Sequence, residues 1–210
     1  MVAAAVGISE RTQENNTVRA TPGGTTNALK ENDEMKLNIE LTEKSREGAI
    51  TMLNTLLADE FVLGAKTRNC HWNVTGPHFH DLHKLFASQY DALDEIMDDV
   101  AERARALGGD AVGTLSEFLK LTRLKEQPGK YPNASQMTAE LLAGHEAVIQ
   151  RLRADVVACD KKLGDAGTTD FLTGTMGRHE KMAWMLRAVL EERYPTQTNG
   201  TIRPLTNKRK

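Results

Sequence analysis

The sequence predicts an all-α fold, built as one bundle of four long helices. Four stretches of more than about twenty residues keep apolar side chains at helical spacing, and glycine or proline separates each stretch from the next. No stretch alternates apolar and polar residues over a useful length, as a half-buried strand would. With 210 residues, 40% of them hydrophobic, the chain has enough apolar side chains for one core.

The helix boundaries follow from caps and breakers. The first helix is expected from an N-cap at Thr42 to His71, and Gly76-Pro77 then breaks the chain. A long crossover separates the second helix from the third. The expected ranges are 42–71, 77–107, 135–163 and about 170–193 for the long helices, 115–121 for a short helix, and 164–169 for the last turn. This pattern predicts a ferritin-like four-helix bundle with a short extra helix in the crossover between helices 2 and 3.

Three parts of the chain differ in composition. Residues 1–36 contain no aromatic side chain and are rich in threonine, asparagine and glycine, so they are predicted to be a flexible N-terminal arm. Residues 37–194 carry the helical pattern and form the bundle domain. Residues 195–210 follow the last helix and are predicted to be a flexible basic C-terminal tail.

Composition also excludes several classes of protein. The N-terminus lacks a basic segment followed by a long apolar one, and no run approaches the roughly 18 apolar residues of a membrane span, so a cytoplasmic location and no membrane contact are expected. A net charge of -2 gives no overall attraction to nucleic acid. Cys70 and Cys159 lack a CxxC pattern and are expected to be small buried side chains rather than a disulfide, which is the alternative.

Two groups of residues suited to metal binding lie near and along the second helix. Four of the six histidines fall between His71 and His83, and six acids follow between Asp91 and Glu102. Each group also has a purely structural interpretation. Such histidines can be hydrogen-bonded core residues, and such acids can form a solvated helix face. However, Asp98 and Glu102 are one helical turn apart and can share a cation. Imidazole with carboxylate suits iron(II), and leaves zinc and manganese open.

Helix length decides how these ligands can meet. His83 and Asp98 are fifteen residues apart on one helix, about 22 Å at 1.5 Å per residue, which is too far for one metal ion. Two subunits whose second helices cross antiparallel near Tyr90 and Asp91 would bring His83 of one to Asp98 and Glu102 of the other. Such a twofold dimer would hold two sites.

The chain closely resembles the Dps family, the DNA-binding proteins from starved cells or mini-ferritins, over about residues 42 to 194. The resemblance is carried by His71-Trp72-Asn73-Val74-Thr75-Gly76-Pro77, Phe79, Leu82-His83, Tyr90, Asp98, Ala101-Glu102-Arg103-Ala104-Arg105-Ala106-Leu107-Gly108-Gly109 and His179-Glu180-Lys181-Met182-Ala183-Trp184-Met185-Leu186.

The resemblance implies a hollow dodecamer built from twofold dimers. It implies that the shell oxidises iron(II), with hydrogen peroxide preferred to oxygen, stores ferric mineral and so protects DNA. Carried over to this chain, His71 and His83 would come from one subunit, and Asp98 and Glu102 from its partner. Trp72 resembles an aromatic near the diiron site that shields the centre or supplies an electron; the alternative is an ordinary core residue.

One position departs from the Dps pattern. The family commonly has an aspartate one turn after the second histidine, where this chain has Ala87. Either His80 or water takes the place of the missing ligand. Water is favoured, because His80 lies more than about 10 Å from Ala87 along the helix. A weaker second iron site and slower oxidation are expected.

Other residues have two interpretations. Asp160, Asp165 and Asp170 either line an acidic pore through which iron enters or cap and solvate helix ends. Arg103 and Glu180 are expected to form a buried ion pair that fixes the second helix to the fourth or to a neighbouring subunit. Further expectations concern side chains of the third and fourth helices: surface or core packing for His145 and His179, and core or dimer contact for Trp184.

The C-terminal tail carries the DNA-binding hypothesis. Its basic residues, repeated in twelve copies, would make weak phosphate contacts multivalent and the protein nucleoid-associated; the alternative is that they only aid solubility. These residues are Arg203, Lys208, Arg209 and Lys210. A ferroxidase with iron storage is therefore the leading function. The alternatives are a DNA-compacting protein with weak ferroxidase activity, because of Ala87, and a purely structural cage.

Overall fold

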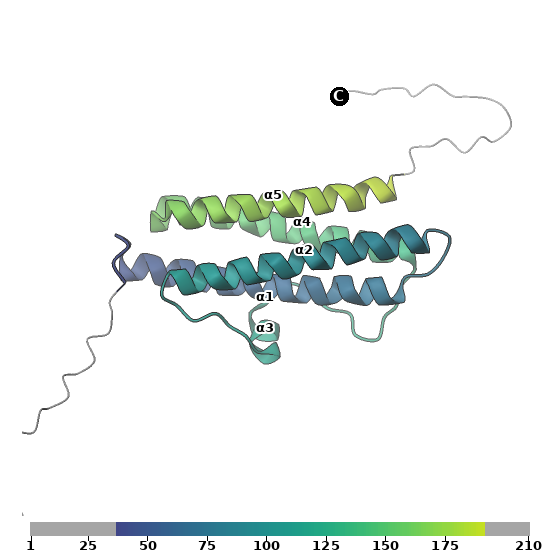
Figure 1. The fold of residues 1–210 in the computed structure, drawn as a ribbon, viewed down its shortest axis with the longest axis horizontal. Coiled ribbons are helices and arrows are strands. Elements are labelled where there is room, and N and C mark those ends of the chain that lie inside the picture. The colour runs from purple at the N-terminus through teal and green to yellow at the C-terminus, as the bar shows by residue number, and fades with distance from the viewer. Residues whose placement is uncertain (1–36, 192–210) are drawn as a thin grey trace, which may run out of the picture. The chain divides into compact units, whose positions relative to one another are not determined.

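The computed structural model describes residues 37–191, and within them every regular element is helical. The four long helices are α1 (Glu43–Asn73), α2 (Phe79–Ala106), α4 (Ala134–Ala158) and α5 (Ala166–Leu190). A short helix, α3 (Leu115–Leu121), lies in the crossover, and one π-helical turn, η1 (Cys159–Leu163), follows α4 (Figure 1). The prediction of an all-α, four-helix bundle with an extra crossover helix is confirmed.

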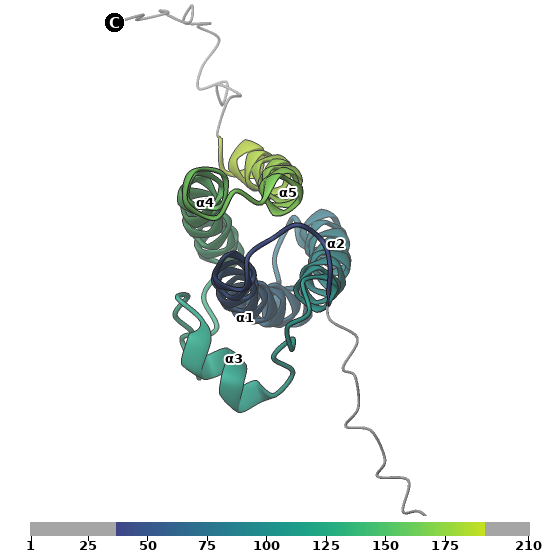
Figure 2. The same cartoon turned by 90° about the vertical axis from the view of Figure 1, so that its left-hand side faces the viewer.

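The bundle consists of two helical hairpins. α1 packs along α2 to form the first hairpin, and α4 packs along α5 to form the second. Viewed along the helices, the four surround a common interior, and α3 lies outside it against α1 (Figure 2).

The interior is filled mainly by aliphatic side chains from all four long helices. Burying each of them stabilises the fold by about 1.5–3 kcal/mol, which is why amphipathic helices pair in this way. The core residues that are at most 1% exposed include Leu53, Leu56, Leu63, Phe86, Leu93, Ile96, Leu141, Leu152, Leu172 and Leu186.

A buried ion pair attaches the crossover to α1. Asp59 is 1% exposed, and its Oδ2 lies 2.7 Å from the guanidinium of Arg123, which follows α3. Its Oδ1 accepts hydrogen bonds from the main-chain N–H of Arg123 and the hydroxyl of Thr122. These contacts account for the ordered path of a crossover that has little regular structure.

Two helix boundaries differ from the prediction by more than three residues. The π-helical turn interrupts the third predicted helix at Cys159, and Gly164 then adopts a left-handed φ of 65°. The last helix begins at Ala166 and not near Asp170, because Asp165 caps it by accepting a hydrogen bond from the N–H of Thr168. The predicted turn over 164–169 is therefore too long.

Several predictions fall outside residues 37–191. They are the N-terminal arm over 1–36, the tail over 195–210, and the tail's basic residues Arg203, Lys208, Arg209 and Lys210. Within the described range, Cys70 and Cys159 are free thiols, which agrees with the prediction of no disulfide. None of the helices in that range is both long and apolar enough to cross a membrane.

Candidate metal centre

His71 and His83 lie against each other where α1 passes into α2. His71 is in the last turn of α1, and His83 is near the start of α2, after the short connection that begins at the buried Val74. Their rings stack with centroids 3.7 Å apart and planes inclined by 21°. The helix connection therefore brings together two histidines that are twelve residues apart in the sequence.

A reciprocal pair of hydrogen bonds determines the tautomer of both rings. Nδ1 of His71 is 2.8 Å from the carbonyl oxygen of His83, and Nδ1 of His83 is 2.9 Å from the carbonyl oxygen of His71. Because a carbonyl can only accept, each Nδ1 must carry the hydrogen and donate it. In the neutral rings each Nε2 then keeps its lone pair, which is the form in which histidine binds a metal.

Neighbouring side chains hold this pair in place. The ring of Tyr90 meets His71 edge-on at 5.2 Å between centroids, and the guanidinium of Arg68 lies 4.8 Å above the Tyr90 ring. Arg68 is itself paired with Asp94. Aromatic and cation–π contacts of this kind limit ring rotation, so the histidine pair is preorganised.

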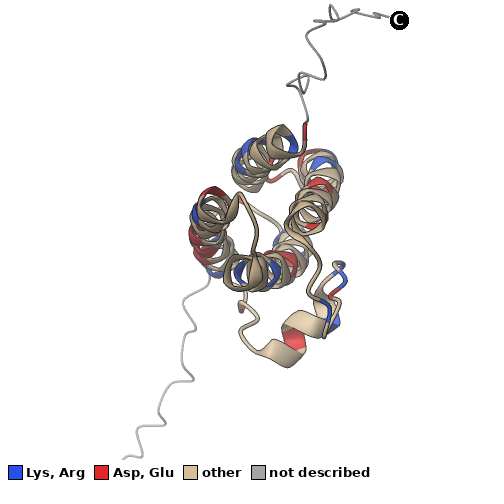
Figure 3. Ribbon diagram, turned by 90° about the vertical axis from the view of Figure 1, so that its right-hand side faces the viewer, with Lys and Arg blue, Asp and Glu red and all other residues tan. Residues whose placement is uncertain are grey.

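The acids of α2 divide into paired and unpaired members. Asp94 pairs with Arg68, while Glu95 and Asp99 both pair with Arg178 of α5 at 2.7 and 3.0 Å. Asp98 and Glu102 are exposed, and among the described residues neither has a hydrogen bond or ion pair. Charged residues of both signs occur on all four long helices (Figure 3). The two carboxylates predicted as ligands are thus free to bind a cation.

One subunit does not bring the two halves together. α2 runs without a break from Phe79 to Ala106 and contains both His83 and Asp98, so these side chains start about 22 Å apart. Within residues 37–191, no three histidine, cysteine or acidic side chains form a group able to hold a metal ion.

The remaining residues near the site differ in how far their side chains are exposed. Trp72 is 71% exposed, so the alternative of an ordinary core residue is wrong for the subunit. Trp184 is 62% exposed, which removes the core alternative and leaves dimer contact as a prediction. His80 is exposed and Ala87 is half-buried on the same helix.

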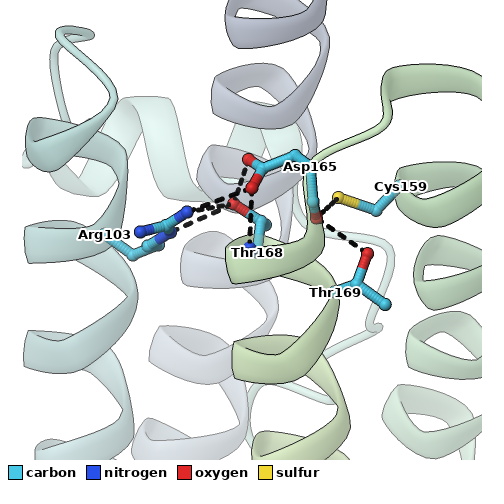
Figure 4. A network of polar contacts seen from close by, with 5 residues as sticks. All are labelled: Arg103, Cys159, Asp165, Thr168 and Thr169. Atoms are coloured by element: carbon cyan, nitrogen blue, oxygen red, sulfur yellow. Dashed lines mark hydrogen bonds and ion pairs between the residues drawn. The ribbon is translucent and has the colours of Figure 1, made fainter. Parts of the chain in front are cut away.

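Arg103 pairs with a different acid from the one expected. Its guanidinium contacts Asp165 at 3.2 Å and donates to the hydroxyl of Thr168 (Figure 4). Glu180 pairs instead with Arg153. Within the subunit, the expected Arg103–Glu180 pair is therefore wrong. The reason is that Asp165 caps α5 directly opposite Arg103.

The three acids of the predicted pore have different environments. Asp165 is 3% exposed and is engaged by Arg103 and Thr168, so it serves as a helix cap, the structural alternative. Asp160 is exposed beside Lys161, whose pKa it raises by hydrogen bonding and charge. Asp170 is also exposed.

A second cluster of ionisable groups lies inside the bundle and was not predicted. Glu60, His145 and His179 are each 0% exposed, with Oε1 of Glu60 2.9 Å from Nε2 of His179. The sequence contained a signal, because Glu60 lies three residues after Leu57 and seven after Leu53, on the core face of α1.

Comparisons with known proteins agree with this fold. Residues 50–193 match the ferritin-like domain family. A low temperature-induced protein of Nostoc sp. PCC 7120 is 45% identical over 166 residues, covering 79% of this chain and 92% of the relative.

Proteins bearing the Dps name are among the matches. The DNA protection during starvation protein 2 of Bacillus anthracis is 34% identical and covers 68% of this chain and 97% of its own. The structure of DpsC from Streptomyces coelicolor has a TM-score of 0.73 at 28% identity, covering 76% of this chain and 93% of that one. The chain therefore belongs to the Dps family of ferritin-like proteins.

Proposed function

We propose that the protein is a ferroxidase and iron store that oxidises iron(II) with hydrogen peroxide. The observation that carries the proposal is the reciprocal His71–His83 contact, which leaves both Nε2 atoms as metal ligands. Asp98 and Glu102, exposed and unpaired among the described residues, supply the anionic ligands that iron(II) prefers alongside imidazole.

The proposed sites form between two subunits. Two α2 helices that cross antiparallel near Tyr90 and Asp91 place the histidines of each subunit against Asp98 and Glu102 of the other. A twofold dimer repeats the contact, so it holds two sites about 22 Å apart. Six such dimers would build the hollow dodecamer that the Dps resemblance implies, with the mineral inside.

The residues have separate roles in the reaction. Two iron(II) ions each lose one electron, and hydrogen peroxide accepts both, so its O–O bond breaks and with two protons it leaves as two water molecules. Asp98 and Glu102 offset the charge of the ions, and the neutral imidazoles of His71 and His83 bind them through Nε2. Trp72, exposed beside His71, would cover the site from solvent or supply an electron.

Ala87 weakens one of the two iron positions. A methyl group stands where the family commonly has a carboxylate, so water is proposed to fill that ligand place, in preference to the exposed His80. A position with one anionic ligand fewer binds iron(II) less tightly. The expected consequence is slower oxidation with the same products.

Iron must reach the interior of such a shell. Asp160 and Asp170 remain proposed as parts of an acidic pore, because both are exposed near the junction of α4 and α5. A ring of such carboxylates would concentrate cations at its mouth.

DNA protection is the second part of the proposal. Several relatives are named for DNA protection during starvation, and consuming iron(II) together with peroxide would prevent the radical chemistry that damages DNA. Arg203, Lys208, Arg209 and Lys210 are proposed to add weak, salt-dependent DNA binding in a cytoplasmic, nucleoid-associated assembly. The competing function is DNA compaction with weak ferroxidase activity.

One experiment separates these functions. Purified full-length protein receives iron(II) and then peroxide, and ferric absorbance is followed in the presence and absence of DNA. Ferric formation that His83→Gln reduces, but the exposed control His78→Gln does not, supports the ferroxidase. Equal rates in the two variants would leave DNA compaction or a structural cage, which a DNA titration at two salt concentrations then distinguishes.

A further inference from the structure

Three ionisable side chains meet in the centre of the bundle. Glu60 of α1, His145 of α4 and His179 of α5 are each 0% exposed. Nε2 of His179 lies 2.9 Å from Oε1 of Glu60, and its Nδ1 lies 3.0 Å from Nδ1 of His145. The His179 ring therefore stands between the carboxylate and the second imidazole, and the three form a chain, named here the core triad.

Few other polar groups lie close to the core triad. Among the described residues no arginine or lysine is within ion-pair distance of Glu60, and His145 Nε2 has no hydrogen-bond partner. The one polar side chain that α2 buries is the uncharged Gln89, whose amide donates to the carbonyl of Met182. The pKa of His145 is thus set by the burial of its ring and by the neighbouring His179.

The short nitrogen–nitrogen contact restricts the protons that the core triad can hold. At 3.0 Å, one Nδ1 must donate a hydrogen and the other must accept it. If both rings become imidazolium, two N–H groups point at each other and two positive charges face a single buried carboxylate. Burial and the neighbouring His179 accordingly lower the pKa of His145 well below its ordinary value of 6.5.

The core triad also joins the two hairpins. Glu60 belongs to the first hairpin, whereas His145 and His179 belong to the second, and the contact crosses the bundle interior seen end-on in Figure 2. The remaining interior contacts between the hairpins are mainly apolar and do not depend on pH. The Nδ1–Nδ1 hydrogen bond joins α4 to α5 within the second hairpin, so its loss in acid would weaken the contact between those two helices.

We infer that the core triad is an acid-sensitive latch between α4 and α5, closed while the histidine pair shares one hydrogen and opened when both histidines are protonated. The sign follows from linkage. Below about pH 6.5 an unfolded chain protonates His145 while the folded bundle resists it, so the unfolded state binds more protons and stability falls as the pH falls. This inference does not depend on the proposed ferroxidase function.

The test compares the full-length protein with a variant that cannot titrate at this position. His145→Asn keeps a side-chain N–H donor near the place of Nδ1, and His78→Gln removes an exposed histidine as the matched control. Urea unfolding is followed by far-UV circular dichroism at several pH values between about 7.5 and 5. As the pH is lowered, the unfolding equilibrium constant of the parent and of His78→Gln should rise faster than that of His145→Asn. The difference should reach up to about tenfold per pH unit.

Parallel pH profiles of the parent and His145→Asn would overturn the inference. Should the variant fail to fold, calorimetric unfolding of the parent at about pH 5.5 in buffers of different ionisation heat gives the proton uptake directly. Uptake of about one proton or more per subunit is expected, and none would overturn the inference. A chelator that shifts the profile of the parent but not of His145→Asn would assign the core triad to a metal and likewise overturn it.

Discussion

His71 and His83 each donate their Nδ1 hydrogen to the main-chain carbonyl of the other, at 2.8 and 2.9 Å, while their rings stack 3.7 Å apart. Two histidines with a purely structural role would need only hydrogen bonds and no free ring nitrogen. Here those bonds leave both Nε2 atoms available for a ligand, and Tyr90 limits rotation of the His71 ring. This arrangement supports the proposal that the pair binds a metal through Nε2 without rearrangement.

Replacing His83 by glutamine should slow oxidation of iron(II) by more than about tenfold, because half of the imidazole ligands and one of the two reciprocal hydrogen bonds are lost. Stopped-flow ferric absorbance after peroxide addition measures the rate. His78→Gln, five residues earlier at the exposed N-cap of α2, is the control and should oxidise iron at the parental rate. An unchanged rate in His83→Gln would remove this residue from the site.

Replacing Ala87 by aspartate should accelerate oxidation and tighten the second iron position, since it restores a carboxylate one helical turn after His83. Titration with iron(II) under anaerobic conditions, followed by addition of peroxide, measures both effects. The companion variant His80→Ala should leave the rate as it is, because water is proposed to fill the ligand place. A large loss of rate in His80→Ala would show that His80 supplies the missing ligand.

Replacing Asp165 by alanine should destabilise the subunit by about 3–5 kcal/mol, because it leaves the partly buried Arg103 without its partner and removes the cap of α5. Urea unfolding measures the change. Asp160→Ala, which removes an exposed acid paired with Lys161, is the matched control and should hardly move the unfolding midpoint. Equal midpoints for the two variants would mean that the Asp165 network contributes nothing.

Cys70 should react slowly with alkylating reagents at neutral pH. Burial, helped by the charge of Glu140, raises the pKa of its thiol to about 11, so the thiolate that reacts is scarce below that value. Mass spectrometry of iodoacetamide-treated protein should show labelling that increases with pH up to about 11 and becomes fast in urea. Rapid labelling of the folded protein at neutral pH would contradict this environment.

The fold could be predicted because helix formation is largely local. Spacing of apolar residues and the breaks at Gly76-Pro77 and Gly108-Gly109 locate the first two helices to within a few residues. The start of α5 was predicted too late in the sequence, because aspartate is also typical of turns. The role of Asp165 as the N-cap of α5 depends on its contact with Arg103, which belongs to a distant helix.

Part of the candidate site could also be predicted from the sequence. The separation of His83 and Asp98 on one helix requires only the rise per residue, and the unbroken α2 bears it out. The reciprocal bonding of His71 and His83 could not be predicted, because it depends on how two helices approach each other. The pairing of Glu60 with His179 was missed for the same reason, since those residues are far apart in the sequence.

The central claim is that each site takes its histidines from one subunit and its carboxylates from another. The most direct test mixes two inactive chains, His71→Gln/His83→Gln and Asp98→Asn/Glu102→Gln, by unfolding and reassembling them together. In a mixed dimer one site then combines the intact histidines of one chain with the intact carboxylates of the other, while the second site lacks both.

Equal random mixing should therefore restore about one quarter of the parental peroxide-dependent iron oxidation, since half of the dimers are mixed and each has one complete site. Each variant reassembled alone should stay inactive. Mixed assemblies that form normally but remain as inactive as either variant would contradict the shared site.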